Sequence, residues 1–488
     1  MEICVAMKPN WSLFFVFLVV RVIFALFQRT TFVPDEHWQS AEVAYRLVFG
    51  APEKTWEWRD DIAIRAHIYP LVFAIFYKLL AITNLDYPWL IAYGPRFIQA
   101  IIAAIGDLSY YRLATMLFGR DAGSLATSCH ITSWMSVFSY TRTTSNATDV
   151  TLTLLGLWLS LVGSRGISVA AAVSFIMRPN SSIFWIPVCI QFASRSNLGL
   201  TIRCLLLGLS LIVFACSVDR IFYGSDTGWL VPWNFLRFNL VLGVAKQYGD
   251  DPWYKYIFMT LGNYLSYTPM VLMGLFKLPR AWLLGSVATF IVLSLSAHKE
   301  LRFLSPVLAV ASIGIAPYLT KNRWFLMVSW VVHAGVGMYC SRWQGAGAEL
   351  VMSRLRDVTK PGEKVMFLTH CHQTPYRSFL HASELQLDFL DCSPWPVRVT
   401  ETSERDSFFA DPARWVKEEG HLRVVDADWI VLDSLVELNQ EFMQFLDEWR
   451  FQDAGPQIFN ALFVEAPKDF RSSFVWGSTF RFLRKESR

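Results

Sequence analysis

The chain has 488 residues, of which 53% are apolar and 15% aromatic, and its mean hydropathy is +0.33. Only 17% of the residues are charged, whereas soluble domains carry about 25%. Because a lipid-facing surface cannot accept charged side chains, this deficit excludes an ordinary soluble protein and indicates an integral membrane protein. The net charge of +4 is too small to suggest a nucleic-acid partner, and no basic stripe with interleaved aromatic residues is present.

The first apolar run covers residues 11–28, close to the ~20 residues that a helix needs to cross a bilayer. The run contains Arg21 and lacks a small-residue cleavage site, so it predicts a retained first helix rather than a signal peptide. Arg21 then either snorkels to the membrane surface or faces the helix bundle, with a functional role as the alternative.

Two adjacent carboxylates, Asp35 and Glu36, follow this run at the point where the chain meets water. A carboxylate at the mouth of a lipid-embedded cavity is well placed to act as a base on a substrate that arrives on a lipid. Asp35 also comes after a proline and before a helical pattern, which is a good N-cap position. The residues alone leave the catalytic and the capping role open. The helix that follows, with Trp38, suits the membrane interface.

The same loop continues with a second group of polar and aromatic residues. Glu57 stands between Trp56 and Trp58, and Arg65 and His67 come just before the next apolar run. The pattern is typical of an aromatic belt with snorkelling cations. It is equally compatible with a sugar-binding groove, in which tryptophan stacks on the sugar and the cations bind phosphate.

Further apolar runs predict about eleven candidate spans in total. They fall near residues 68–83, 89–106, 122–139, 147–163, 167–193, 199–216, 257–277, 280–297, 303–319 and 323–340. The sequence Arg178-Pro179-Asn180 interrupts one run and predicts a break into two short helices. Arg142 lies between two runs without an obvious partner, unless Asp149 is one.

Basic turns between the runs predict the topology. The turns at 277–280 and 321–323 carry lysine and arginine, which the positive-inside rule places in the cytoplasm. The segments that alternate with them then share the opposite compartment: 29–66, 217–255, 298–302 and everything after residue 341.

Four ionisable residues, His298, Lys299, Glu300 and Arg302, stand at the junction of two apolar runs. Charges at a membrane edge are costly unless they are exposed or paired, so they indicate a functional site. On a helix, His298 and Arg302 would share a face and could clamp a phosphate. The alternative is that a Lys299–Glu300 network orders the loop.

The composition changes after about residue 345, and we predict two domains: a polytopic transmembrane catalytic domain over 1–341 and a small α/β domain over 342–488. Short apolar stretches at 364–370, 423–434 and 461–467 predict strands, and residues 349–358 and 436–450 predict amphipathic helices. The tail contains Cys371 and Cys392, which could form a disulfide if the tail faces an oxidising lumen. Its histidines match no closed zinc site, so we expect no metal.

Six segments together resemble a known family: FVPDEHWQSAEVAYRLVFG, TWEW, IYPLVFA, DRIFYGSDTGWLVPWNFLRFN, HKELRFLSP and CHQTPYRSFLH. The combination resembles the endoplasmic-reticulum mannosyltransferases that use dolichyl-phosphate-mannose. The fourth and sixth segments resemble the branch that adds the third mannose to the glycosylphosphatidylinositol (GPI) precursor. Asn146-Ala147-Thr148-Asp149 departs mildly from the family's Asn-x-x-Glu by shortening the acid.

The resemblance implies a GT-C fold, a multi-pass location in the endoplasmic-reticulum membrane and an active site that faces the lumen. It also implies an inverting α-1,2 transfer of mannose from dolichyl-phosphate-mannose to the GPI-precursor glycolipid. A phosphate leaves well without a general acid, so one carboxylate base suffices. Asp35 would be that base, with Glu36 orienting it or replacing it, and no cofactor is expected.

His298 and Arg302, together with Arg65 or His67, would then neutralise the lipid phosphate. The remaining residues expected to contact substrate are Trp38, Trp56, Glu57, Tyr69, Arg142, Lys299 and Glu300. The nearest alternative is a sibling enzyme that adds the fourth GPI mannose or builds the N-glycan precursor. A transporter or flippase would show inverted repeats and charges near the bilayer midplane, whereas here the charges crowd one interface.

Overall fold

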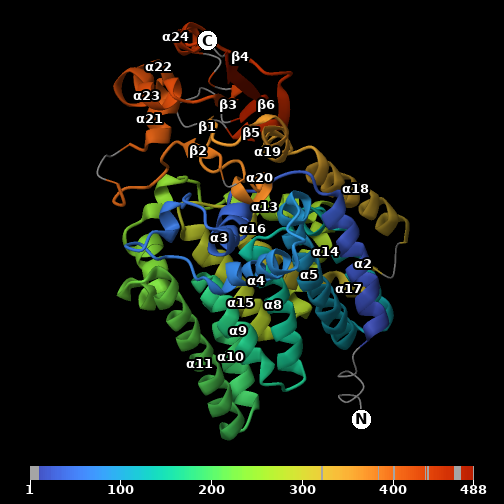
Figure 1. The fold of residues 1–488 in the computed structure, drawn as a ribbon. Helices are drawn as coiled ribbons and strands as arrows, with labels where there is room; N and C mark the ends of the chain where they lie inside the picture. Colours follow the sequence, from blue (N-terminus) through green and yellow to red (C-terminus); the bar gives the residue numbers. More distant parts are fainter. Residues whose placement is uncertain are drawn as a thin grey trace. The chain divides into compact units, whose positions relative to one another are not determined.

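The computed structural model describes residues 10–319, 323–382, 384–398, 402–434, 436, 439–465 and 474–486 (Figure 1). The basic turn predicted at 321–323 lies largely outside these residues. The chain forms two compact units. The first, here the helical unit, comprises Met1–Phe27, Glu57–Leu71 and Arg96–Met338; the second, the mixed unit, comprises Gln28–Trp56, Val72–Pro95 and Tyr339–Arg488.

Helices make up nearly all of the regular structure before the tail. In chain order they are α2 (Trp11–Phe27), α3 (Glu42–Phe49), α4 (Ile68–Thr83), α5 (Pro88–Phe118), α6 (Arg120–Thr132), α7 (Trp134–Ser139), α8 (Ser145–Leu161), α9 (Gly166–Met177), α10 (Ser182–Arg195), α11 (Leu198–Tyr223), α12 (Val231–Leu236), α13 (Lys255–Tyr264), α14 (Thr268–Gly274), α15 (Arg280–Leu295), α16 (Leu301–Ser312), α17 (Ala316–Leu319) and α18 (Arg323–Arg342).

Four helical segments among the described residues are long and apolar enough to cross a membrane: Pro88–Phe118, Leu198–Tyr223, Leu301–Leu319 and Trp324–Val358. Four shorter apolar helices are α2, α4, α9 and α15. The predicted number of about eleven spans is therefore not confirmed. One reason is that bends divide the apolar runs: the run 167–193 breaks at Pro179, as predicted, into α9 and α10.

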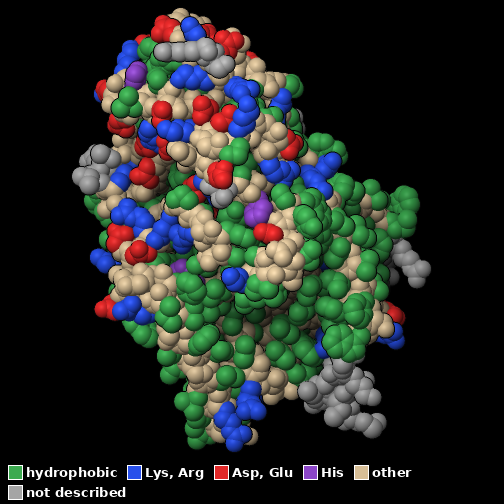
Figure 2. Space-filling view, in the orientation of Figure 1, with side chains coloured by type: hydrophobic (Ala, Val, Ile, Leu, Met, Phe, Trp, Pro, Cys, Tyr) green, Lys and Arg blue, Asp and Glu red, His purple; other side chains and the backbone are tan. Residues whose placement is uncertain are grey.

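The surface of the helical unit suits a lipid environment. Figure 2 shows mainly hydrophobic side chains over α9, α10 and α11. Only 11% of the most apolar window of α11 is buried, so most of its leucine and valine side chains face outward. Because water would disfavour such a surface, this helix is placed for contact with acyl chains.

Arg21 of α2 faces the interior of the helical unit and does not snorkel. Its side chain is fully buried, and its guanidinium donates to both carboxylate oxygens of Asp107 over 2.7 and 2.6 Å. It also donates to the Ser136 hydroxyl over 2.8 Å. The bundle-facing prediction is thus confirmed, and the buried charge has a buried partner.

The tail contains a six-stranded sheet in the order β2-β1-β3-β6-β4, with β5 paired to β6. Its strands are β1 (Lys364–Leu368), β2 (Gln386–Phe389), β3 (Trp429–Asp433), β4 (Phe451–Asp453), β5 (Ile458–Glu465) and β6 (Phe474–Lys485). The first three are parallel and β6 is antiparallel to its neighbours. The helices are α19 (Gly347–Val358), α20 (Arg377–Leu380), α21 (Glu404–Ala410), α22 (Pro412–Trp415), α23 (His421–Val425) and α24 (Gln440–Glu448).

The predicted α/β tail is therefore present, with one correction. Residues 423–425, predicted as the start of a strand, belong to helix α23, and the strand begins only at Trp429. The mixed unit starts in the tail at Tyr339, near the predicted boundary after residue 341, and also includes two earlier segments, Gln28–Trp56 and Val72–Pro95.

Alternation along β1 gives the sheet two apolar faces, because successive side chains point to opposite sides. Met366 and Leu368 pack in the cluster that includes residues of α21, α22 and α24. Val365 and Phe367 pack in the cluster that includes α19, α20 and Trp38. Trp38, which follows the candidate carboxylates Asp35 and Glu36, thus packs on one face of the tail sheet.

Candidate functional site

The two candidate carboxylates, Asp35 and Glu36, lie in different environments. The helical segment that carries them begins at Asp35, and Glu36, at the N-cap of the π-helical turn His37–Ala41, makes no side-chain capping hydrogen bond. Glu36 is fully buried, and its Oε2 accepts the backbone N–H of Phe32 over 3.1 Å. Asp35 remains partly exposed. The structure therefore gives Glu36 a role in holding the preceding turn, and Asp35 is the more exposed carboxylate of the two.

Trp38 does not offer a surface to a sugar. Its side chain is 4% exposed, and its indole N–H donates to the backbone carbonyl of Thr374 over 3.0 Å. The ring packs against His372 and Tyr376, with centroids 5.0 and 4.8 Å away. The structure thus gives no support to the predicted substrate contact of Trp38, because protein covers the indole.

Two acids of the same loop hold the tail in the mixed unit. The Oε1 of Glu42 accepts the Tyr376 N–H over 2.7 Å and the Ser378 hydroxyl over 2.6 Å. Glu53 forms a buried ion pair with Arg377, with 2.7 Å between Oε1 and the guanidinium. Burial raises the pKa of Glu42 from 4.5 to about 7, although hydrogen bonds from Ser378 and Tyr376 oppose this shift.

This raised pKa predicts a pH-dependent stability. Below pH 7 the folded protein binds a proton at Glu42 more readily than the unfolded chain does, so stability should fall as pH rises from about 5 to about 7. We expect the Glu42→Gln protein, which stays neutral, to lose this part of the slope. Melting temperatures of the detergent-solubilised protein between pH 5 and 8 would measure it. Glu441→Gln, at an exposed carboxylate, is the control and should keep the wild-type slope.

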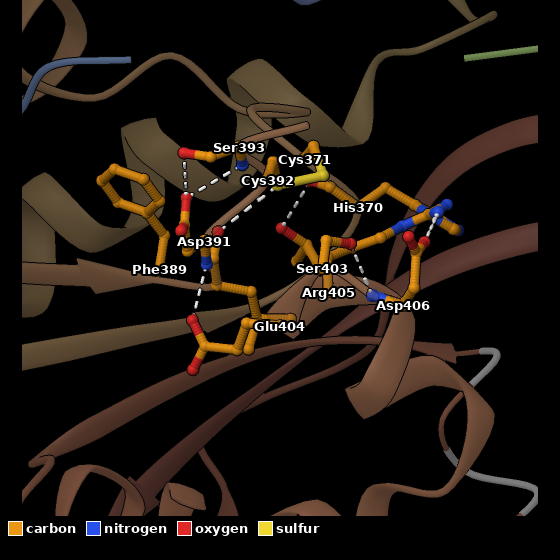
Figure 3. Close-up of a disulfide and its surroundings, with 12 residues drawn as sticks. His370, Cys371, Phe389, Asp391, Cys392, Ser393, Ser403, Glu404, Arg405 and Asp406 are labelled. Atoms are coloured by element: carbon orange, nitrogen blue, oxygen red, sulfur yellow. Dashed lines mark hydrogen bonds and ion pairs between the residues drawn. A yellow bond between two sulfur atoms is a disulfide. The ribbon is translucent and has the colours of Figure 1, made fainter. Parts of the chain in front are cut away.

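Cys371 and Cys392, the predicted pair, are joined by a disulfide with an S–S distance of 2.06 Å (Figure 3). Beside it, His370 stacks on Phe409 and lies 2.9 Å from the guanidinium of Arg405. Burial lowers the pKa of His370 to about 3 and that of His372 to about 4, so both rings are neutral at physiological pH.

Metal binding has no visible support in the described part of the chain, where no three His, Cys, Asp or Glu side chains form a group that could hold an ion. That the reaction needs no metal stays a prediction.

The predicted loop 29–66 divides between the units, and its second part belongs to the helical unit. Glu57 accepts from Arg65 over 2.9 Å. Asp219 of α11 accepts the backbone N–H of His67 over 2.7 Å and lies 3.0 Å from its Nδ1. His67 and Tyr69 are buried. The two contacts from Asp219 dock the segment on α11 and give His67 a structural role. Trp56 of the mixed unit and Arg65 remain partly exposed.

Glu300 holds both predicted phosphate ligands in the helical unit. Its Oε1 lies 2.8 Å from Nε2 of His298, and its two oxygens accept from Arg302 over 2.5 and 2.8 Å. The predicted geometry was wrong, because α16 begins at Leu301 and His298 precedes the helix. The carboxylate, rather than a shared helix face, brings the two side chains together.

Lys299 points away from this group. It is 2% exposed, its ammonium donates to the Asp251 carbonyl over 2.9 Å, and its backbone N–H donates to the Asp251 carboxylate over 3.1 Å. Lys299 therefore orders the loop, which was the alternative to phosphate binding, but its partner is Asp251 rather than Glu300. Gly249 lies beside the site: a Cβ there would be 3.0 Å from Nδ1 of His298.

Glu300 is held as a carboxylate by its neighbours. Burial opposes ionisation, but the charge of Arg302 and the hydrogen bonds from His298 and Arg302 outweigh it and keep the pKa of Glu300 well below its usual range. For the mannose transfer that the sequence resemblance implies, we expect Glu300→Gln to lower the rate by about 100-fold, the effect of losing one oriented charged contact in an active site. A mannosyl-transfer assay on membranes would measure it. Asp250→Asn, at an exposed carboxylate, should keep wild-type activity.

Arg142 and Asp149 do not have the partners that the sequence suggested. The Nε of Arg142 donates to the Phe138 carbonyl over 2.6 Å, and the side chain is fully buried. Asp149 accepts the Ser181 hydroxyl over 2.6 Å and lies 4.0 Å from Arg178. Both contacts are internal to the helical unit, so a substrate contact of Arg142 has no support in this geometry.

Residues 12–381 match the model of the Alg9-like mannosyltransferase family. The chain belongs to this family. It is 33% identical to GPI alpha-1,2-mannosyltransferase 3 of Danio rerio, over 92% of this chain and 87% of the relative. It is also 31% identical to Mannosyltransferase APTG1 of Arabidopsis thaliana, over 94% of this chain and 90% of the relative.

The fold of this Alg9-like chain is found in a solved membrane protein. ArnT from Cupriavidus metallidurans, in a crystal structure bound to undecaprenyl phosphate, superposes with a TM-score of 0.59, covering 96% of this chain and 97% of ArnT. At 12% identity the likeness concerns the fold alone. It confirms the polytopic, mostly helical GT-C type that the sequence predicts.

Sequence reasoning missed the acids that hold the candidate site of this Alg9-like chain. Glu42 and Glu53 hold the tail, Asp219 holds His67, and Asp251 holds Lys299. Each stands in an ordinary polar or amphipathic stretch. The only signal in the sequence was the set of cations at the membrane edge that needed partners.

Proposed function

We propose that this chain transfers the third mannose, in α-1,2 linkage, from dolichyl-phosphate-mannose to the GPI precursor on the luminal side of the endoplasmic-reticulum membrane. The observation that carries the proposal is the likeness along nearly the whole chain to proteins named GPI alpha-1,2-mannosyltransferase 3 from several vertebrates. The membership in an Alg9-like mannosyltransferase family supports the reaction class independently.

Asp35 is the proposed base. It would take the proton from the acceptor hydroxyl as the sugar carbon is attacked, while the lipid phosphate leaves with the electron pair of the bond that breaks. Support comes from its partial exposure beside the buried Glu36. Glu36, whose oxygen is bound to the Phe32 N–H, would act by holding the turn rather than by taking the proton.

His298 and Arg302 are the proposed ligands of the donor phosphate. Both are oriented by Glu300, and Nδ1 of His298 has no hydrogen-bond partner among the described residues. Preorganised cations stabilise charge as it develops on a leaving phosphate. With cations in that role, the reaction as proposed requires no divalent metal.

The test is to express the chain in cells that lack each candidate mannosyltransferase and to identify the GPI intermediate that accumulates. Rescue of the third-mannose mutant, with loss of the two-mannose intermediate, is the expected result. Rescue only of the fourth-mannose mutant, or of an N-glycan mutant, would assign the chain to a sibling reaction. Rescue of none would contradict the proposed function.

A further inference from the structure

The tail segment 371–381, here called the tail clasp, lies against the helix that carries Asp35. The Thr374 carbonyl accepts the indole N–H of Trp38 over 3.0 Å, and the His372 ring lies 5.0 Å from the Trp38 ring. His372 also lies within electrostatic reach of Asp35, three residues before Trp38 in the chain. The tail clasp is thus placed beside the proposed base, within the mixed unit.

Three fixed contacts hold the tail clasp in this place. Glu42 accepts hydrogen bonds from its backbone at Tyr376 and from the Ser378 hydroxyl, and Glu53 pairs with Arg377. At its start, the disulfide to Cys392 fixes the chain, as Figure 3 shows. Breaking a buried ion pair is costly, so the segment has a defined position next to Asp35.

The tail clasp also carries covered polar atoms without a hydrogen-bond partner among the described residues. Two of them are Nδ1 of His372 and Oε1 of Gln373. Covered polar atoms are nearly always bonded, which indicates that a ligand or solvent completes them. Both side chains are partly exposed.

The chemistry of these groups points to a neutral, hydroxyl-rich ligand. The Gln373 amide is uncharged, and burial keeps the pKa of His372 at about 4, with Asp35 and Asp391 as the carboxylates that oppose this shift. A lipid phosphate would call for cations, whereas sugar hydroxyls both donate to and accept from neutral groups. Both the donor mannose and the acceptor glycan offer such hydroxyls, but the tail clasp lies beside Asp35, the proposed base for the acceptor hydroxyl, which points to the acceptor.

We infer that the tail clasp is an acceptor-binding wall of the active site, in which His372 and Gln373 hydrogen-bond the sugar hydroxyls that are presented to Asp35. The inference rests on the proposed function, since it assigns these residues to the acceptor of that reaction. It also explains why two segments separated by more than 300 residues are joined by buried polar contacts in one unit.

The test uses the purified full-length protein with a synthetic acceptor glycolipid. Gln373→Ala and His372→Asn are expected to weaken acceptor binding, measured without donor, by about three- to tenfold, the effect of one neutral hydrogen bond. In turnover assays the KM for the acceptor should rise by the same factor, with the KM for dolichyl-phosphate-mannose unchanged. Gln386→Ala, at an exposed glutamine of the same domain, is the matched control and should change neither constant.

Unchanged acceptor binding in both variants would overturn the inference, as would equal changes in the two KM values. Melting temperatures identify a variant that fails to fold. The inference is then judged on the acceptor binding of the other variant. The proposed function fails separately: a wild-type protein that binds the acceptor through Gln373 but transfers no mannose would contradict the reaction and leave the binding wall in place.

Discussion

Asp35→Asn is expected to abolish rescue of surface GPI-anchored proteins in cells that lack the third-mannose transferase. Asparagine keeps the shape of the side chain but cannot take a proton, and a positioned general base contributes about 10²- to 10⁴-fold to a rate. Glu36→Gln should keep activity within about tenfold, because its amide oxygen can still accept the Phe32 N–H. Flow cytometry of GPI-anchored proteins, together with assays of mannosyl transfer in membranes, would measure both variants.

The comparison between these two neighbours separates chemistry from folding. Both proteins should reach the membrane in wild-type amounts, which immunoblotting of membrane fractions would establish. Full activity of the Asp35→Asn protein, or loss of activity confined to Glu36→Gln, would contradict the assignment of the base. The distinction depends on one observation, namely that Glu36 is buried and Asp35 is not.

Arg21→Met is expected to lower the stability of the helical unit by about 3–5 kcal/mol, the effect of removing one partner of a buried ion pair. The change would leave Asp107, which is 1% exposed, without the guanidinium that it faces in two hydrogen bonds. Arg21→Met combined with Asp107→Leu should recover much of the loss, because no unpaired charge then remains. Melting temperatures and yields of the detergent-solubilised protein would measure these effects.

The control for this experiment is an exposed ion pair. Arg220 pairs with Asp226, whose side chain is 89% exposed, and exposed pairs contribute about 0–1 kcal/mol. Arg220→Met should therefore keep the wild-type melting temperature. An Arg21→Met protein as stable as the wild type would show that the pair does not stabilise the helical unit.

The mixed unit changes how the tail is understood. A tail domain joined only by its connection to the last helix could be removed without effect on the first loop. Here the first loop contributes Trp38 to the core on one face of the tail sheet, and it holds the tail clasp through Glu42 and Glu53. We therefore interpret the tail as part of the apparatus that presents Asp35.

Sequence patterns predicted the class of the protein, the break at Pro179, the main strands of the tail and the two cysteines that pair. The first three features follow from patterns within a few residues: apolar runs, a helix-breaking proline and period-two alternation. The cysteine pair follows from the predicted oxidising compartment. The same local patterns placed the ionisable residues at 298–302 together, and they marked Asp35 and Glu36 as candidate carboxylates.

Which of these side chains are already bound by other parts of the protein became clear from the folded structure. Trp38 is covered by the tail clasp, Glu36 holds a turn, Lys299 is bound to Asp251, and Glu42 accepts hydrogen bonds from residues more than 300 positions away. The physical reason is that desolvation and hydrogen-bond partners depend on the packing of distant segments. No period or spacing within one segment of the chain encodes that packing.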